Sequence, residues 1–544
     1  MYETTAERLI ERWKKLTAAK SNWESLWEEV ATYVLPSRKG FTTKKTPGSY
    51  RGQGVYDSTA IHANHMLASH MHSALTSPAT PWFSLRYGTD ELNSDDKSLE
   101  WLDACSSRMY AAFSDSNFST QASELYNDLV ALGTGAMFIE AATQEPDFKL
   151  QFHSLHLGSI CCAENADGIV DTIYHKRKMS ARQAVQRWEK AEELDKIKDA
   201  MERNPDKEFS FLHCVSPNPD WQPDAAIPEP KYRRFKSYWV AIDDKEILEE
   251  NGYYESPYVI PRWSKVVGDI YGYGPGIMAR ADIRTINEAK RMELAAYEKA
   301  IDPPLLASAT GVISDVHLES GGLTFVRDMN ALAPLMQATQ WQATQIKSEE
   351  LRNNILSIFL IDQLSFGPQK TNTTATEMEL RYAMMNRVLG PTSGRLQQEF
   401  LNPLIERVFG IMYRTGQFEA APDTVGSDNV TVEYQGPLAR NQRYEDAQAI
   451  ERLFGVAAQW AQMVPNALDI IDVNGAIRIL AERYGVPSKA LKGEGEVEEA
   501  QQQRVQKQAE AEQMQMEAAM AQTNATQASG MKDAAAAAEL GGVM

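Results

Sequence analysis

The chain has 544 residues, of which 43% are hydrophobic and 24% charged, a composition typical of a folded protein. It carries 55 Lys and Arg against 74 Asp and Glu, so the net charge of −19 argues against a protein that grips DNA with a basic face. Four cysteines are too few for a disulfide framework and indicate a reducing compartment. The start of the chain lacks a signal-peptide pattern, and no apolar run reaches the ~18–20 residues of a membrane span.

Amphipathic helices are predicted over the first part of the chain, because apolar residues recur there at three- or four-residue steps. The predicted ranges are 6–35 (one helix or a broken pair), 60–75, 98–113 and 120–132. Gly133 and Gly135 are expected to end the last of these helices.

Short strands are predicted between residues 136 and 259, where the spacing of apolar residues changes. The predicted strands are 137–140, 150–153, 169–174, 208–214 and 238–242, and one helix is predicted at 181–203. Asp167-Gly168 and Asn251-Gly252 predict turns between strands. This part is therefore expected to be a mixed α+β unit.

Long helices return after Gly276. The first, residues 277–302, is about 39 Å long at ~1.5 Å per residue and is stopped by Pro303 and Pro304. A Gly-containing segment with β character follows, and then a second long helix at 335–361. Further helices are predicted at 376–416, 441–464 and 473–484, with a strand at 430–434. Residues 496–529 contain neither Gly nor Pro and predict a long helix that needs partners to pack against.

The common signatures of enzymes are missing from the sequence, which has no phosphate loop, no Gly-x-Ser-x-Gly elbow and no His-Glu-x-x-His. The segment 272–276 (Gly-Tyr-Gly-Pro-Gly) superficially suggests a phosphate-binding turn. Pro275, however, removes one backbone N–H that such a turn needs, so a structural turn into the next helix is the favoured interpretation.

Two clusters of metal-binding residue types also favour structural roles. The histidines His62, His65, His70 and His72 share one predicted helix, but His70 points away from the others and a metal site needs convergent ligands. Cys161 and Cys162 are adjacent in a predicted extended segment, so one is expected to be buried and the other partly exposed. The basic clusters at 176–178 and 233–236 are expected to be solvated faces.

A particular order of motifs runs through most of the chain. Its residues are Pro261-Arg262-Trp263, Gly272-Tyr273-Gly274-Pro275-Gly276, Thr374-Ala375-Thr376-Glu377 with Arg381, Gly390-Pro391, Arg395, Glu399, Leu401-Asn402-Pro403-Leu404 and Arg407. Upstream, Ser77-Pro78, Pro81-Trp82-Phe83 and the segment 129–135 fit the same pattern. Together these residues resemble the portal, or head-to-tail connector, proteins of short-tailed bacteriophages. The resemblance covers residues 5 to 500 and is poorest at the C-terminal tail.

The resemblance implies a multidomain, ring-forming fold, mainly α with an α+β wing. By analogy with the family, the expected parts are the wing (1–276), stem helix 1 (277–302), the clip (303–334), stem helix 2 (335–361), the tunnel loop (362–376), wing helices (377–437), the crown (438–500) and a C-terminal Ala/Gln/Met-rich helical barrel or tail (501–544).

The implied function is structural rather than enzymatic, with no cofactor and no metal. A homo-dodecamer at one capsid vertex would be the conduit for packaging and ejecting double-stranded DNA, without sequence-specific contacts. The implied partners are the terminase large subunit, a tail adaptor or head-completion protein, the major capsid protein and scaffolding or internal core proteins, with no membrane. The expected location is the virion, after assembly in the host bacterial cytoplasm. An acidic ring is compatible with this role, because repulsion from the phosphates keeps DNA from sticking.

Two groups of residues are expected to line the tunnel. The tunnel loop contributes Gln369, Lys370, Thr371, Asn372 and Thr373, and the first stem helix contributes Arg284, Glu288, Lys290, Arg291 and Lys299. The residues leave two alternatives open: another structural ring or scaffold protein of a virion, and an enzyme with a dispersed active site.

Overall fold

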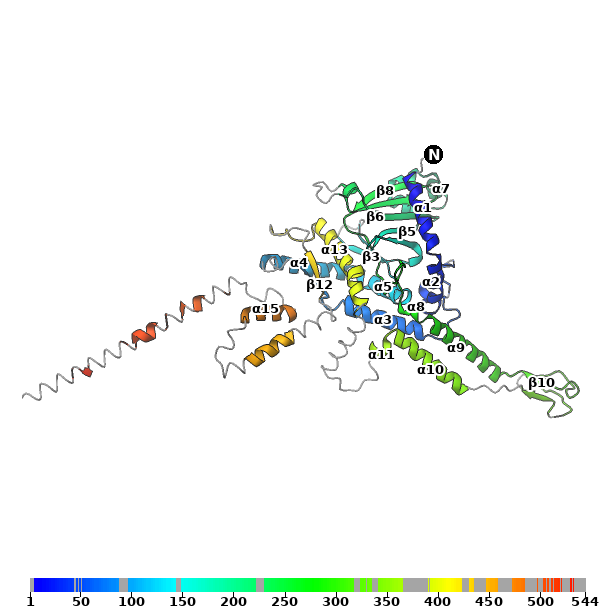
Figure 1. The fold of residues 1–544 in the computed structure, drawn as a ribbon. Coiled ribbons are helices and arrows are strands. Elements are labelled where there is room, and N and C mark those ends of the chain that lie inside the picture. Colours follow the sequence, from blue (N-terminus) through cyan, green and yellow to red (C-terminus); the bar gives the residue numbers. More distant parts are fainter. Residues whose placement is uncertain are drawn as a thin grey trace, which may run out of the picture. The chain divides into compact units, whose positions relative to one another are not determined.

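The computed structural model describes residues 4–364 and 390–484, with gaps at 44–45, 47, 50, 88–95, 143–147, 222–228, 318–322, 329, 335–340, 391, 423–429, 435–446 and 458–471, and short stretches between 497 and 532. Two compact units are formed by this chain. The first contains residues 1–86 and 102–443, and the second contains residues 87–101 and 444–544. The fold is mixed, with many helices and several antiparallel sheets (Figure 1).

The chain begins with the broken helix pair that the sequence left open, α1 (Thr5–Ala19) and α2 (Ser21–Tyr33). Thr4 and Glu7 form a capping box that starts α1. Lys20 lies between the two helices. Its ammonium group can be buried because protein groups take the place of the water that would otherwise surround it. Its Nζ donates to the carbonyl oxygens of Leu157, Gly158 and Ile160 at 2.8–3.3 Å and pairs with Glu24 at 3.0 Å.

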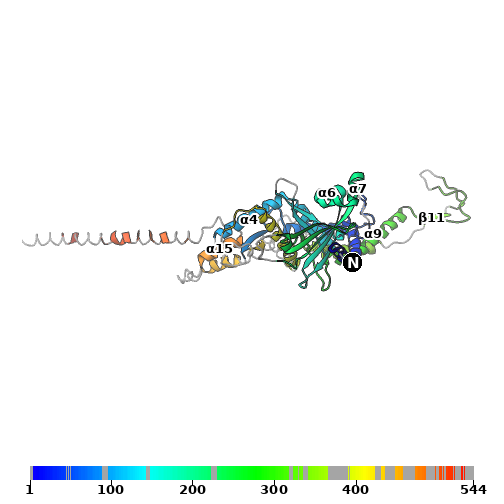
Figure 2. The same ribbon diagram turned by 90° about the horizontal axis from the view of Figure 1, so that it is seen from above.

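A five-stranded antiparallel sheet is the largest sheet of the first unit. Its order is β4 (Ile160–Glu164), β5 (Val170–Ser180), β6 (Glu208–Pro217), β7 (Phe235–Ala241) and β8 (Glu246–Tyr253). Helix α1 covers one face, and α6 (Ala181–Arg187), η4 (Glu189–Glu193) and α7 (Asp195–Arg203) cover the other, as Figure 2 shows from above. Because both faces are covered, Cys161 and Cys162 are both buried, and the expectation that one is partly exposed is wrong.

Helices α3 (Thr59–Leu75) and α5 (Phe118–Leu132) pack together beside a three-stranded sheet. The order of that sheet is β3 (Leu150–Ser154), β2 (Met137–Ala141) and β9 (Tyr258–Val259). Helix α4 (Asp96–Asp115) and the two-stranded pair of β1 (Phe83–Tyr87) with β12 (Val430–Tyr434) complete this part. The predictions of these helices and of strands β2, β3 and β12 are confirmed, with bounds that differ by a few residues at most.

Two further local predictions are wrong, the turn at Asn251-Gly252 and the single helix at 181–203. Gly252 lies inside β8, and β1, β4, β8 and β9 are strands beyond the predicted ones. The chain reverses instead before β8, where Lys245 adopts a positive φ of 56°. The predicted helix at 181–203 is three helices, because Trp188 is extended and turns its ring into the core under the sheet.

The second unit contains α15 (Val473–Tyr484), whose bounds match the prediction. The residues that are described between 502 and 520 are helical, as the lack of Gly and Pro predicts. Over the described parts of both units, no helix is long and apolar enough to cross a membrane.

Candidate functional site: a helical hairpin and its base

A long hairpin projects from the first unit (Figures 1 and 2). It consists of α9 (Arg280–Ile301), the paired strands β10 (Leu305–Ala307) and β11 (Leu332–Pro334), and α10 (Trp341–Ile358), which returns beside α9. A further bridge joins Val312 to Val326 near the tip. The 22 residues of α9 give it a length of about 33 Å at ~1.5 Å per residue. The hairpin therefore carries its tip far from the core of the unit.

Large apolar side chains are exposed along this hairpin. On α9 the exposed residues include Met292 (58%), Leu294 (51%) and Ile301 (84%). The tip adds Leu306, Ile313, Leu323 and Phe325, of which Leu323 is 76% exposed. These exposed apolar side chains offer surface for contact with other chains.

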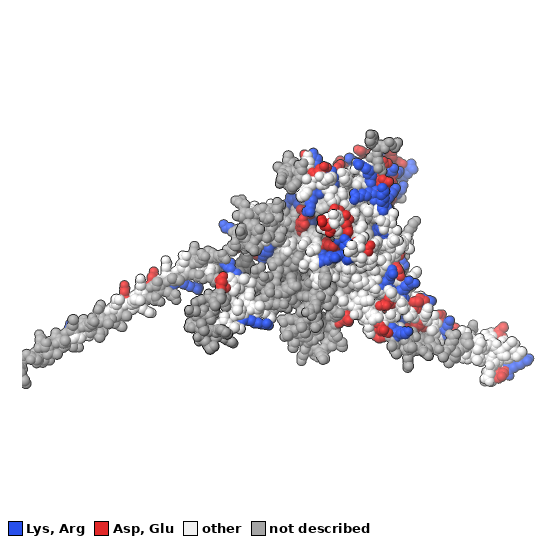
Figure 3. Space-filling view, in the orientation of Figure 1, with Lys and Arg blue, Asp and Glu red and all other residues white. Residues whose placement is uncertain are grey.

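The five predicted stem charges all lie on α9, but they are not equivalent. Glu288 and Arg291 pair at 2.6 Å, and Lys290 pairs at 2.7 Å with the buried Glu293. Arg284 reaches Glu29 of α2 at 3.7 Å while staying 73% exposed. Lys299 is exposed and has no ion pair within the described residues. Figure 3 shows positive and negative side chains interleaved along α9.

A polar clasp holds the base of the hairpin. Asn287 of α9 is 7% exposed; its Oδ1 accepts from the backbone N–H of Tyr56 at 2.7 Å and its Nδ2 donates to the Gly54 carbonyl at 2.8 Å. Arg352 of α10 pairs with Asp57 at 2.9 Å. Burial alone would raise the pKa of Asp57, but hydrogen bonds from Thr59 and Arg352 hold that pKa below its usual value. The loop of residues 54–57 thereby holds both α9 and α10.

The glycine-rich turn ahead of α9 packs against the C-terminal end of α5. Gly133 has a φ of +77°, and a Cβ on it would strike the backbone of Gly272 and Gly274. The Gly272 N–H donates to Thr134 Oγ1 at 2.8 Å, and the Trp263 N–H donates to the Gly133 carbonyl at 2.9 Å. The structure therefore confirms a structural turn here, with backbone packed on backbone in place of a phosphate.

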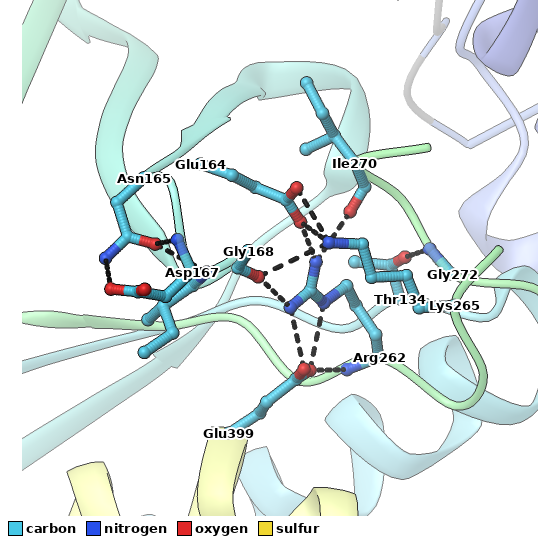
Figure 4. A network of polar contacts seen from close by, with 11 residues as sticks. Thr134, Glu164, Asn165, Asp167, Gly168, Arg262, Lys265, Ile270, Gly272 and Glu399 are labelled. Carbon is cyan, nitrogen blue, oxygen red and sulfur yellow. Dashed lines mark hydrogen bonds and ion pairs between the residues drawn. The ribbon is translucent and has the colours of Figure 1, made fainter. Parts of the chain in front are cut away.

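Arg262 is the centre of a buried ion-pair network behind this turn (Figure 4). Its guanidinium binds Glu399 at 2.7 and 3.0 Å, Glu164, and the carbonyl oxygens of Gly168 and Ile270. Lys265 also pairs with Glu164, at 2.7 Å. Although burial lowers the pKa of Arg262, its bonds to Glu399 and Glu164 outweigh burial and raise that pKa. The network ties the turn between β4 and β5 to the π-helical turn η6 (Gln397–Leu401).

The network lines a cleft of about 950 Å³ that also includes Trp221, Arg234 and Arg395. The carboxylates of Glu164 and Glu399 are engaged with Arg262 and Lys265, whereas Nη1 of Arg395 is buried and has no hydrogen-bond partner among the described residues. Among the described residues no group of three His, Cys, Asp or Glu could hold a metal ion. His72 is bonded instead to Thr76 and Ser119, at 2.9 and 3.1 Å.

The tunnel-loop residues Gln369, Lys370, Thr371, Asn372 and Thr373 lie outside the described residues. Arg262 and Glu399 belong to separate motifs of the sequence, and no local pattern pairs them. The sequence likewise carries no signal for Glu164, for Asn287 or for the pair of Asp57 with Arg352. The partners of Asn287 and Asp57 lie over 200 positions away.

An apolar hairpin held on a rigid, ion-paired base is typical of a subunit of a larger assembly. Residues 6–491 match the model of the bacteriophage head to tail connecting protein family, and the chain belongs to this family. It is similar to the portal protein of Salmonella phage epsilon15, with 28% identity over 510 residues, 92% of this chain and 91% of the relative. It is also similar to a probable portal protein of Bordetella phage BPP-1, with 27% identity over 499 residues, 89% and 88% of the two chains. The chain is a structural virion component with a phage portal function, and not an enzyme.

Proposed function

We propose that twelve copies of this chain form a closed ring at one capsid vertex, through which double-stranded DNA is packaged and ejected. The observation that carries the proposal is the exposed apolar surface of the hairpin, which a single chain leaves uncovered. Neighbouring hairpins packed side by side around an axis would cover it, since head-to-tail contacts that close make rings. The named portal relatives support the same role.

In this proposal α9 and α10 are the stem, β10 and β11 belong to the clip, and residues 362–376 form the tunnel loop. Residues 1–276 and 377–437 make the wing, residues 438–500 the crown and residues 501–544 the helical barrel. Arg284 and Lys299 are the best tunnel-facing candidates on α9, because both are exposed and neither is held by a neighbour on its own helix. Glu288 pairs with Arg291 and Lys290 pairs with Glu293, so the charges of these residues are largely neutralised within α9.

The clip is proposed to dock the terminase large subunit during packaging and the tail adaptor afterwards, while the wing contacts the capsid and scaffolding or core proteins. Its exposed Ile313, Leu323 and Phe325 offer apolar area for such contacts. Deleting residues 310–324 should leave the sheet of the wing folded and abolish capture of the adaptor in a pull-down. Unchanged capture would remove the clip from docking.

The mass of the purified protein and its class averages in electron micrographs test the ring. The expected result is a ring of twelve 60.9-kDa chains at micromolar concentration. A ring with one subunit more or fewer would still support closure, whereas monomers alone at that concentration would overturn the proposal.

A further inference from the structure

The five-stranded sheet carries a charged helix on each of its faces. On one face, Ala6 and Ile10 of α1 pack on Tyr174 and Leu212 of the sheet. On the other, Ile197 and Ala200 of α7 pack in the core that contains Phe209. Figure 2 shows α1, near the N-terminus, and α7 on opposite sides of the sheet. The outer surfaces of the two helices therefore point in opposite directions from one rigid layer.

The outer surface of α1 is basic. Arg8, Arg12 and Lys15 are exposed and lie opposite the buried Ala6 and Ile10, and we call these three residues the basic ridge. Lys15 has a distant partner, Glu11 at 3.9 Å, while Arg8 and Arg12 have no carboxylate within ion-pair distance among the described residues. Figure 3 shows basic side chains gathered where α1 crosses the sheet.

The basic surface extends onto the neighbouring strand. Lys176 of β5 lies on the same face of the sheet as Tyr174, and its Nζ sits 5.6 Å from the ring centre of Trp13 on α1. It too has no ion-pair partner within the described part of the chain. Arg8 and Lys15 are thus the cations of this surface that are most available to another chain, whereas Arg12 hydrogen-bonds Tyr174 and Lys176 lies against Trp13.

The outer surface of α7 carries a row of three carboxylates, although the helix as a whole has three acidic and three basic residues. Asp195, Asp199 and Glu202 recur at four- and three-residue steps, opposite the buried Ile197 and Ala200, and all three are exposed. We call them the acidic ridge. Lys198 and Arg203 stand on its flanks, but the described residues place no cation within ion-pair distance of the three carboxylates. The ridge is one helix face wide, as the basic ridge is.

We propose that the basic ridge of one subunit docks on the acidic ridge of the next subunit around the ring, so that the sheet layers pack as a head-to-tail series. The inference rests on the proposed ring. A heterologous contact requires two complementary patches on opposite sides of one subunit, which is what α1 and α7 provide. Each chain carries a net charge of −19, so neighbours repel unless opposite charges meet where they touch.

Duplex DNA is the other occupant that a basic ridge could take. A second copy is favoured because the complementary surface is present on the same sheet, and because Glu11 lies among the cations of α1, whereas Glu7 is paired with Lys245 at 2.9 Å. Carboxylates within the ridge would repel phosphates but can pair with Lys198 and Arg203 beside the acidic ridge.

Charge exchange between the ridges tests the proposal. The variants are Arg8→Glu/Lys15→Glu, Asp199→Lys/Glu202→Lys and the combination of all four. Assembly of the full chain is followed by mass photometry over a range of concentrations, at low and high salt. We expect each double variant to raise the concentration for half-assembly by about tenfold or more, and the combination to return it to within about threefold of the unmodified protein.

The control for Arg8→Glu/Lys15→Glu is Lys14→Glu/Arg108→Glu, which makes the same change of net charge at two exposed residues off the ridge. A basic-ridge variant that assembles like this control would overturn the placement of the interface while the ring stands. If the combined variant does not recover assembly, the placement of the interface is likewise overturned. If the unmodified chain never assembles, the proposed ring itself is overturned. Loss of 30-bp duplex binding in Arg8→Glu/Lys15→Glu, with rings unaffected, would assign the ridge to DNA and overturn the proposal.

Discussion

Arg262 and Glu399 are 137 positions apart in the sequence, yet the guanidinium of Arg262 binds both carboxylate oxygens of Glu399 inside the first unit. The Nη2–Oε1 distance is 2.7 Å and the Nε–Oε2 distance is 3.0 Å. The Arg262 side chain is 2% exposed, and the Glu399 side chain is 21% exposed. The pair joins the segment that leads into the hairpin to the helices that follow residue 390, so it holds together two parts of the proposed wing that are distant in the sequence.

Removing this arginine should be strongly destabilising. Arg262→Ala leaves Glu399 as a partly buried carboxylate without its cation and leaves Glu164 with Lys265 alone, and breaking a buried ion pair costs about 3–5 kcal/mol. Urea unfolding followed by tryptophan fluorescence measures the change in the free energy of unfolding. The control is Arg234→Ala, whose side chain is 55% exposed and 3.9 Å from Glu406, and which should cost less than about 1 kcal/mol. Equal losses in the two variants would contradict the role of the network.

The contact between α5 and the glycine turn predicts that Gly133 cannot be replaced. In Gly133→Ala the positive φ of 77° costs about 1–2 kcal/mol, and the new Cβ also strikes the backbone of Gly272. Gly416→Ala is the matched control, because its φ is +68° after a helix but no atom lies within 4 Å of the added Cβ. Thermal unfolding should show a clearly larger loss for Gly133→Ala. Similar melting temperatures for both variants would exclude the backbone contact.

Two buried histidines predict loss of stability in acid. The Nδ1 atoms of His175 and His213 lie 3.2 and 2.5 Å from the hydroxyl of Tyr258, in the core between the sheets. Burial is the main cause that lowers the pKa of His175 to about 3 and the pKa of His213 well below its usual value. Since the unfolded histidines bind protons from about pH 6.5 downward and the folded ones do not, stability should fall as the pH drops below that value.

At pH 5 the contribution of His175 alone amounts to about 2 kcal/mol, because one pKa unit is 1.36 kcal/mol and the pH is about 1.5 units below the pKa of the unfolded state. Urea midpoints at pH 7.5 and pH 5.0 measure the loss, with the exposed His62→Gln as control. The variant His175→Asn should lose less between the two pH values than the unmodified protein. An identical pH dependence in both would exclude His175 from the effect.

The tunnel loop predicts a defect in DNA handling. Lys370 is the single cation among residues 369–374, so a ring of twelve would present twelve ammonium groups to the strand. Lys370→Glu should leave ring formation intact and impair completion or retention of packaged DNA, more severely at low salt because the contact is electrostatic. Lys207→Glu, an exposed charge reversal in the wing, is the control. Full-length packaging and normal retention in Lys370→Glu at both salt levels would remove this residue from the mechanism.

The sequence by itself determined the element types wherever a local signal was strong. Apolar spacing and Gly133 placed α5, Pro303 and Pro304 ended the first long helix near Ile301, and the ordered motifs indicated the connector family. The same patterns placed α15 at its observed bounds.

Only the tertiary structure decided which motifs meet and which surfaces stay open. Strands β4 and β8 were missed because β4 is short and buried on both faces and β8 is rich in Glu, so neither alternates clearly. The pairing of Arg262 with Glu399, and the clasp of Asn287 around residues 54–56, join residues more than 130 positions apart. Local propensity does not predict such pairs. A buried charge is tolerated only when the distant chain segments that neutralise it have been brought together, which is a property of the tertiary structure.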